Sequence, residues 1–305
     1  MSMVSVRTLI KAFRLPFLTG SLMPVVMVAA FAFFSGEAFN LTYFLLTFLG
    51  VAALHSGGNL INDYYDSFGS DPLNRFVSPF SGGSRVIIEG ELSAGTVRLL
   101  AFACLGLGVA CGLLLIYQGR PWVALVGVLG LAAAYHYSAA PVQLMSLGLG
   151  EFTIFLAFGP ILTFGAYYVM TGTLKMVGLA LGLPLGFLIT AILWINEFPD
   201  LEADAAAGKR QLVVRLGIGR ARLVYAGLML AAFVSLFALI EAFGLPPHIL
   251  AGFAALPPAL QAIRGAWRTA PTSPEFVAIQ ALTIQTHFTM GLALTLSLLY
   301  AALRH

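Results

Sequence analysis

The stretch of sequence that decides the fold is Asn59-Leu60-Ile61-Asn62-Asp63-Tyr64-Tyr65-Asp66-Ser67-Phe68-Gly69-Ser70-Asp71, which continues an apolar run and ends among acids. A second stretch, Asn196-Glu197-Phe198-Pro199-Asp200-Leu201-Glu202-Ala203-Asp204, continues a later apolar run in the same way. Both contain the order Asn, acid, aromatic residue, any residue, Asp. On a helix, residues four positions apart face the same side. Each stretch therefore predicts a helix end that presents an amide and carboxylates on one face.

The composition predicts a protein embedded in a membrane. Of the 305 residues, 59% are hydrophobic and 10% are charged, and the mean hydropathy is +0.92. Soluble domains carry about 25% charged residues, so this chain lacks the charge to cover a water-facing surface. Apolar runs of roughly 20 residues, the length that crosses a bilayer, recur along it. We expect an all-α polytopic membrane protein with nine transmembrane helices, at approximately 15–34, 41–62, 95–117, 121–138, 147–169, 176–195, 221–243, 247–264 and 277–302.

Most basic residues fall on one side of this layout. All but three of the 16 Lys and Arg residues lie on the side of the N-terminus, and the three others are Arg120, Lys175 and Arg304. Cytoplasmic loops of membrane proteins are rich in Lys and Arg. We therefore expect a multi-pass protein of the inner or cell membrane whose N-terminus is cytoplasmic. Most carboxylates lie on the same side, in two long connections, and long loops are usually functional.

The two matching stretches also bear on domain organisation. We expect a single domain over residues 1–305, with two possible four-helix halves at about 15–138 and 147–264 and an added ninth helix. Pro257-Pro258 interrupts the eighth span. If the halves face one another, the acidic stretches converge at the cytoplasmic mouth of a central cavity.

Convergence of these acids predicts a metal site. Several carboxylates brought together repel one another unless a positive charge lies between them. Mg²⁺ is a hard, oxygen-seeking ion that one or two carboxylates and substrate phosphates commonly hold. The alternative is that the acids are solvated loop charges or helix caps. The expected ligands are Asn62, Asp66, Asp71, Asn196, Asp200 and Asp204.

Each acidic stretch is followed by a segment suited to phosphate. The first segment runs from Arg75 to Arg85 and contains Ser84, and its Gly and Ser residues let backbone N–H groups approach an anion. The second contains Lys209 and Arg210. Arginine offers a bidentate fork to phosphate oxygens. The alternative is that these cations only set the topology or meet anionic lipid.

A third polar segment ends the fourth span, beside both acidic connections. It contains Tyr137 and Ser138, and Glu151 begins the fifth span. Tyrosine is common at membrane interfaces and an acid suits a helix N-terminus, so these residues have a structural reading as well as a functional one. His55 and His136 have no partner at ligand spacing, and we expect both to be satisfied polar residues.

These residues resemble the UbiA superfamily of intramembrane aromatic prenyltransferases over essentially the whole chain. Asn62, Asp66 and Asp71 are similar to the first Asp-rich motif of the family, and Asp200 and Asp204 to the second. The resemblance implies nine helices around a central cavity, cytoplasmic cap loops over a Mg²⁺ site, and a lateral opening to lipid. Residues 200–217 look most like the 1,4-dihydroxy-2-naphthoate prenyltransferases of menaquinone synthesis, although Pro199 departs from that pattern, as does the stretch Phe80–Ser84.

The resemblance also implies a reaction. A Mg²⁺-dependent enzyme of this kind transfers a polyprenyl group from an isoprenoid diphosphate to an aromatic acceptor, without nucleic acid. Other acceptors, 4-hydroxybenzoate or a glyceryl phosphate, are alternatives, and an ion-coupled transporter is a rival from another class. The implied catalytic residues are Asp66, Asp200 and Tyr137; the implied diphosphate-binding residues are Lys209, Arg210, Arg75, Arg85 and Ser84; and the residues implied to line the acceptor or cation site are Tyr64, Ser138, Glu151 and Trp194.

Overall fold

Helices, most of them long and apolar, build most of the described structure. The computed structural model describes residues 5–304, and all regular secondary structure in that range is helical. The α-helices are α1 (Val6–Ala12), α2 (Thr19–Phe34), α3 (Leu41–Asp66), α4 (Ala94–Tyr117), α5 (Val123–His136), α6 (Gly150–Phe158), α7 (Pro160–Thr171), α8 (Met176–Ala180), α9 (Leu183–Ala206), α10 (Leu212–Phe243), α11 (Leu256–Arg268) and α12 (Phe276–Ala302). Four short 3₁₀ segments join them: η1 (Leu15–Leu18), η2 (Asp71–Leu73), η3 (Leu144–Leu147) and η4 (Pro247–Ala255).

Eight helical segments in this range are long and apolar enough to cross a membrane, and α5 is a shorter ninth. The all-α multi-pass prediction is therefore confirmed, and the number nine holds only if α5 is counted. With 14 residues, α5 is about 21 Å long at 1.5 Å per residue, less than the roughly 30 Å of a hydrocarbon core. The division into two four-helix halves stays a prediction.

Proline and glycine shape two of the spans in ways that the hydropathy pattern hides. Pro257 and Pro258 lie in the first turn of α11, where a missing N–H costs nothing, so the eighth span continues from η4 into α11 instead of ending. The fifth span divides at Gly159, between α6 and α7. A Cβ at Gly159 would lie 2.8 Å from the Gly182 carbonyl oxygen and 2.8 Å from the Gly186 Cα. Only glycine permits this close approach of the chain to α9.

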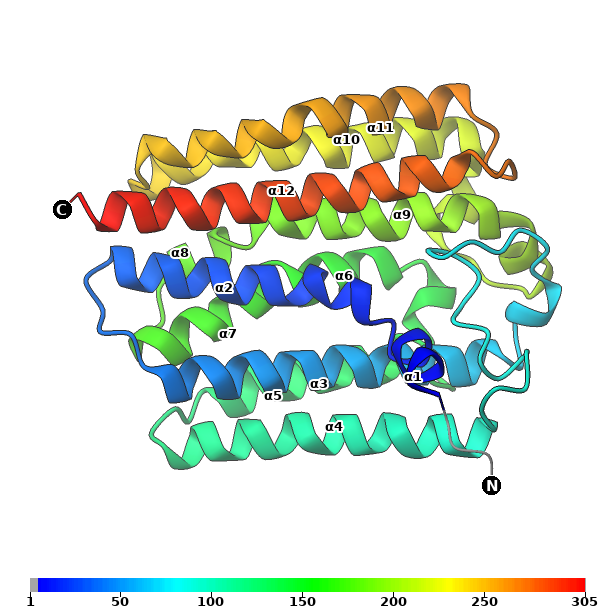
Figure 1. The fold of residues 1–305 in the computed structure, drawn as a ribbon, viewed down its shortest axis with the longest axis horizontal. Coiled ribbons are helices and arrows are strands. Elements are labelled where there is room, and N and C mark those ends of the chain that lie inside the picture. The colour runs from blue at the N-terminus through cyan, green and yellow to red at the C-terminus, as the bar shows by residue number, and fades with distance from the viewer. Residues whose placement is uncertain (1–4, 305) are drawn as a thin grey trace.

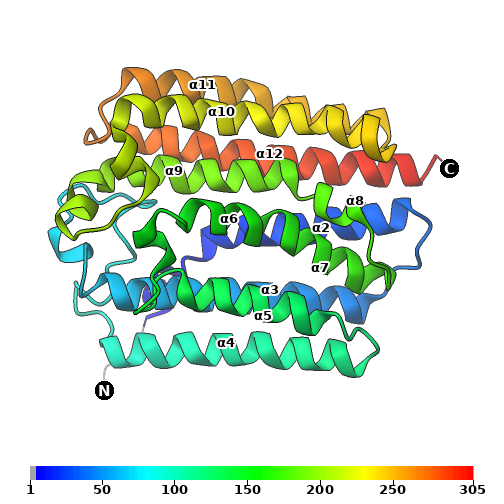
Figure 2. The same cartoon turned by 180° about the vertical axis from the view of Figure 1, so that it is seen from behind.

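The spans stack side by side in layers (Figures 1 and 2). One edge is α4, which packs on α3; α2 and α7 lie in the middle; α9 and α12 follow, and α10 and α11 form the other edge. Helix α1 and the long connection of residues 67–93, here called the cap loop, lie at one end of the molecule, and the C-terminal end of α12 lies at the other (Figure 1). An odd number of spans would place α1 and the end of α12 at opposite ends in this way.

The acidic stretches are helix ends, as their four-residue spacing predicted, and the expectation that their acids lie in long connections is wrong for most of them. Helix α3 continues to Asp66, and α9 continues to Ala206, so Asp200 and Asp204 are helical. Apolar runs alone under-estimate the helices, because each helix extends past its hydrophobic segment. Asp71 lies in the cap loop, at the start of η2.

Candidate active site

A cavity of about 360 Å³ lies between the helices and is lined at one end by the cap loop. All six predicted metal ligands line that end: Asn62, Asp66, Asp71, Asn196, Asp200 and Asp204. The two acidic stretches, distant in the chain, therefore meet around one cavity.

Lys209 joins the two stretches directly. Its Nζ lies 3.0 Å from Asp66 Oδ1 and 3.1 Å from Asp204 Oδ1, and its side chain is only 9% exposed. Burial alone would lower the pKa of Lys209, but the two carboxylates outweigh burial and raise it. Gly208, with φ at +78°, ends α9 and lets the Lys209 N–H donate back to the Asp204 carbonyl at 2.9 Å. This left-handed helix ending aims the ammonium group at the carboxylates.

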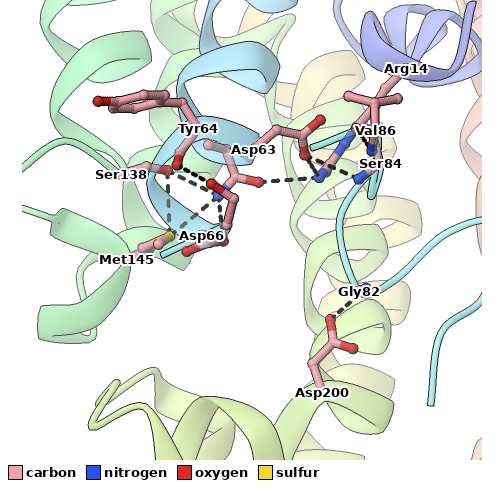
Figure 3. Close-up of polar contacts among 12 residues, drawn as sticks. Arg14, Asp63, Tyr64, Asp66, Gly82, Ser84, Val86, Ser138, Met145 and Asp200 are labelled. Atoms are coloured by element: carbon pink, nitrogen blue, oxygen red, sulfur yellow. Dashed lines mark hydrogen bonds and ion pairs between the residues drawn. The ribbon is translucent and has the colours of Figure 1, made fainter. Parts of the chain in front are cut away.

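The cap loop is tied to the second stretch through Asp200. Asn74 Nδ2 donates to Asp200 Oδ1 at 2.7 Å. The Gly82 N–H donates to Asp200 Oδ2 at 3.1 Å (Figure 3). The pattern of the sequence did not single out Asn74. The cap loop thus reaches the cavity mouth with an amide and a backbone donor.

Asn62 and Asp63 hold the first stretch in place. Asn62 Nδ2 donates to Asp66 Oδ2 at 2.8 Å and to Ser138 Oγ at 3.0 Å. Arg14 pairs with Asp63, which also accepts the Ser84 N–H at 3.1 Å (Figure 3). Ser138 therefore holds Asn62 in place, and the Ser84 backbone holds Asp63, so both serines stabilise the first acidic stretch. The N-terminal charge pattern had indicated only a topology role for Arg14, yet Arg14 lines the cavity.

A polar residue of the last span also reaches the site. Gln280 of α12 is 1% exposed; its Nε2 donates to Asn196 Oδ1 at 3.0 Å, and its Oε1 accepts the Ser78 hydroxyl at 3.0 Å. One amide therefore connects the second stretch to the cap loop. A glutamine inside an apolar span is itself a signal of function, and that signal was overlooked.

The remaining predicted residues divide into two groups. Tyr137 lines the cavity. Tyr64, Glu151 and Trp194 do not line it. Tyr64 packs on Tyr65, Phe68 and Arg98. The Glu151 carboxylate accepts the Leu212 N–H at 2.6 Å, and Trp194 Nε1 donates to the Ala221 carbonyl at 2.9 Å. Arg75, Arg85 and Arg210 do not line the cavity either. Arg85 donates to the Asp71 carbonyl at 3.1 Å, and Arg75 and Arg210 are exposed.

The donor atoms at the mouth fit a hard divalent cation. Carboxylate and amide oxygens are what Mg²⁺ prefers, and it takes one or two carboxylates when phosphates complete its shell. Burial of Asp71, together with the nearby Asp66 charge, raises the pKa of Asp71 to about 7, as expected for a carboxyl whose counter-charge is incomplete. Within residues 5–304, no three Asp, Glu, His or Cys side chains form a ready metal cluster. Because Mg²⁺ needs few carboxylates when phosphates complete its shell, the acids at the mouth suit a cation that arrives with phosphate oxygens.

Gly83 offers a test of the position of Asp71. Gly83 has φ at +75°, and a Cβ there would collide with the Asp71 carboxylate. If Asp71 helps to hold Mg²⁺, Gly83→Ala should displace it and raise the Mg²⁺ concentration needed for half-maximal turnover about 10- to 100-fold, the usual cost of disturbing the residues around a metal ion. Gly90→Ala is the matched control, since Gly90 has φ at +71° in the same loop with nothing within 4 Å of its Cβ. Equal Mg²⁺ curves for the two variants would show that only backbone strain matters.

Fold and site define a helical, multi-pass membrane protein with an acidic cavity at one end. The model of the UbiA prenyltransferase family matches residues 21–301, and the chain belongs to that family and is a prenyltransferase. This assignment favours an enzyme over the rival transporter.

Named relatives and solved structures agree with the family. The chain is 33% identical over 218 residues to a 1,4-dihydroxy-2-naphthoate octaprenyltransferase of Mycobacterium tuberculosis, covering 72% of each chain. It is 25% identical over 287 residues to the octaprenyltransferase of that name in Bacillus subtilis, covering 94% of this chain and 90% of the other. A UbiA homolog from Aeropyrum pernix shares the fold with a TM-score of 0.67 at 17% identity, covering 90% and 96%. One from Archaeoglobus fulgidus, solved with DMAPP and Mg²⁺, gives 0.64 at 20% identity, covering 92% and 98%.

Proposed function

We propose that this prenyltransferase moves a polyprenyl group from an isoprenoid diphosphate to 1,4-dihydroxy-2-naphthoate, a step of menaquinone biosynthesis, with Mg²⁺ as cofactor. The observation that carries the proposal is the meeting of both Asp stretches and Lys209 at the polar end of a cavity whose remaining walls are mostly apolar. A diphosphate with a long hydrocarbon tail is divided in the same way, into a charged head group and an apolar tail.

The polar end is assigned to the diphosphate. Asp66, Asp71, Asp200 and Asp204 would hold Mg²⁺, with Asn62 and Asn196 orienting them or adding an amide oxygen. The ion would supply Lewis-acid charge that neutralises the leaving diphosphate. Asp66 and Asp200 are the central residues of this assignment.

The chain's own cations and apolar walls complete the site. The ammonium of Lys209 lies among the acids, and Arg14 lines the same mouth, so both can bind phosphate oxygens that enter there. Tyr137 presents an aromatic ring from the end of α5, which suits cation–π contact with an allylic cation. The apolar walls hold the prenyl chain and exclude water that would otherwise capture that cation.

The acceptor assignment has separate support. The two relatives from Mycobacterium tuberculosis and Bacillus subtilis carry the naphthoate name, and residues 200–217 resemble that branch. We also propose that the site faces the cytoplasm, because α1 and the cap loop lie at the same end (Figure 1) as most Lys and Arg residues of the layout, in keeping with the positive-inside rule.

The test is a reaction with purified protein in detergent. Radiolabelled geranylgeranyl diphosphate is incubated with 1,4-dihydroxy-2-naphthoate, 4-hydroxybenzoate or a glyceryl phosphate, with Mg²⁺ or with EDTA. We expect Mg²⁺-dependent release of diphosphate and a lipid-soluble product only with the naphthoate. A product with another acceptor in preference to the naphthoate would overturn the acceptor, and turnover that is unaffected by EDTA would overturn the metal.

A further inference from the structure

The apolar chamber beneath the diphosphate end contains a small polar group that the proposed function leaves unused. Ser21 of α2 and His55 and Asn59 of α3 line the cavity, among apolar neighbours such as Leu54 and Phe158. Ser21 Oγ lies 2.9 Å from His55 Nδ1, and the His55 ring meets Phe158 edge-on, with centroids 4.7 Å apart.

The hydrogen bond of Ser21 to Leu18 favours one direction for the Ser21–His55 contact. The Ser21 hydroxyl donates to the Leu18 carbonyl at 3.1 Å, so its oxygen is free to accept from His55 Nδ1–H. A neutral imidazole with a proton on Nδ1 carries a lone pair on Nε2. Nε2 is therefore the nitrogen that offers an acceptor to a ligand.

Asn59 offers the complementary donor. Its Nδ2 is buried, and the described part of the chain gives it no hydrogen-bond partner. Leaving such a buried donor without a hydrogen bond costs about 1–3 kcal/mol, and buried polar atoms are nearly always paired. Because Asn59 lines the cavity, an oxygen atom of a bound molecule can supply the missing partner.

The position of this pair on α3 suits the second substrate. His55, Asn59, Asn62 and Asp66 follow one another at helical spacing, and all four line the cavity. Asn59 and Asp66 are seven residues apart, which corresponds to about 10 Å along the helix axis. A planar ring held at Asn59 and His55 would therefore lie just below a diphosphate at Asp66, where the allylic carbon is.

We propose that His55 and Asn59 form the acceptor subsite, a place for an aromatic ring with a hydroxyl next to a second oxygen substituent. The hydroxyl donates to His55 Nε2, and Asn59 Nδ2 donates to the neighbouring oxygen. This inference rests on the proposed function, since 1,4-dihydroxy-2-naphthoate has a hydroxyl beside its carboxylate. Contrary to our expectation from the sequence, His55 is then more than a satisfied polar residue.

The experiment measures KM separately for the two substrates in Asn59→Leu and His55→Phe. We expect KM for the naphthoate to rise about tenfold in each, the value of one lost hydrogen bond, with KM for geranylgeranyl diphosphate changed less than twofold. Thr47→Val is the matched control: Thr47 lies on α3 and lines the same cavity, but its hydroxyl already donates to the Tyr43 carbonyl at 2.8 Å.

A second arm uses 4-hydroxy-2-naphthoate, which lacks the hydroxyl beside the carboxylate. Wild type should bind this analogue more weakly than the full acceptor, and His55→Phe should not discriminate between the two. If either variant fails to fold, Asn59→Ser and His55→Gln replace them. Suppose that the wild type transfers the prenyl group to the naphthoate. An unchanged naphthoate KM in the variants, or a parallel rise of both KM values, then overturns the subsite. If the wild type does not transfer to the naphthoate at all, the proposed function has failed instead.

Discussion

Asp66→Asn and Asp200→Asn should each lower turnover more than roughly 100-fold, because even the outer-shell partners of metal ligands are worth about 10- to 100-fold. Asparagine keeps the volume of aspartate but removes the charge that attracts a divalent cation. Asp200 accepts from Asn74 and Gly82, and the amide oxygen of asparagine can keep one of these bonds. In Asp66→Asn, Lys209 keeps Asp204 as its partner at 3.1 Å, so the buried ammonium is still paired. Both variants should therefore fold while the chemistry is lost, with Asp66→Asn the less stable of the two.

The measurement is diphosphate release and labelled product over a range of Mg²⁺ concentrations. Glu202→Gln is the control, because Glu202 lies between Asp200 and Asp204 on α9, has the same charge, and is exposed. The control should retain wild-type turnover. A near-normal rate for Asp66→Asn or Asp200→Asn would refute the assignment of these residues.

The elements that the sequence predicted well depend on local patterns. The apolar length of each run located all nine segments, and the four-residue spacing of Asn62 and Asp66 placed both on the cavity side. The break at Gly159 was not predictable in this way, because it arises from contact with α9, a segment far along the chain.

Helical periodicity explains two residues that the sequence placed in the acceptor site but the cavity excludes. Tyr64 is two positions from Asn62 and from Asp66, and Trp194 is two positions from Asn196. Two positions correspond to roughly 200° around a helix, so a residue at that spacing faces away from the cavity. The helical period can be read from the sequence, and it is a better guide to which residues face the cavity than the presence of an aromatic ring near the acids.

The partners of other site residues could not be predicted, because they arise from tertiary contacts, although the position of Gln280 inside an apolar span did indicate a function. Asn74 and Gln280 are single amides with no spacing partner, and each becomes meaningful only when the cap loop, α9 and α12 come together. Arg14 carried the same topology signal as the other N-terminal cations. Its left-handed backbone, with φ at +49°, lies directly before η1 and turns the chain beside Asp63.

Lys209→Met should produce the second large effect, and it should appear even without substrate. Removing one partner of a buried ion pair leaves uncompensated charge and costs about 3–5 kcal/mol. Here Asp66 and Asp204 would face each other with the cation gone, and both side chains are largely buried. The thermal midpoint of the substrate-free protein should fall clearly, and turnover should fall with it.

Added Mg²⁺ separates the electrostatic explanation from simple loss of packing. A divalent cation can bind the two freed carboxylates, so we expect Mg²⁺ to restore much of the thermal midpoint of Lys209→Met but not its turnover, because the ammonium that contacts the diphosphate is still absent. Arg210→Met is the matched control, as Arg210 is the neighbouring cation and is exposed; neither its midpoint nor its response to Mg²⁺ should change. A Lys209→Met midpoint that is insensitive to Mg²⁺ would mean that Asp66 and Asp204 do not share a cation site, since carboxylates that repel each other must respond to a charge placed between them.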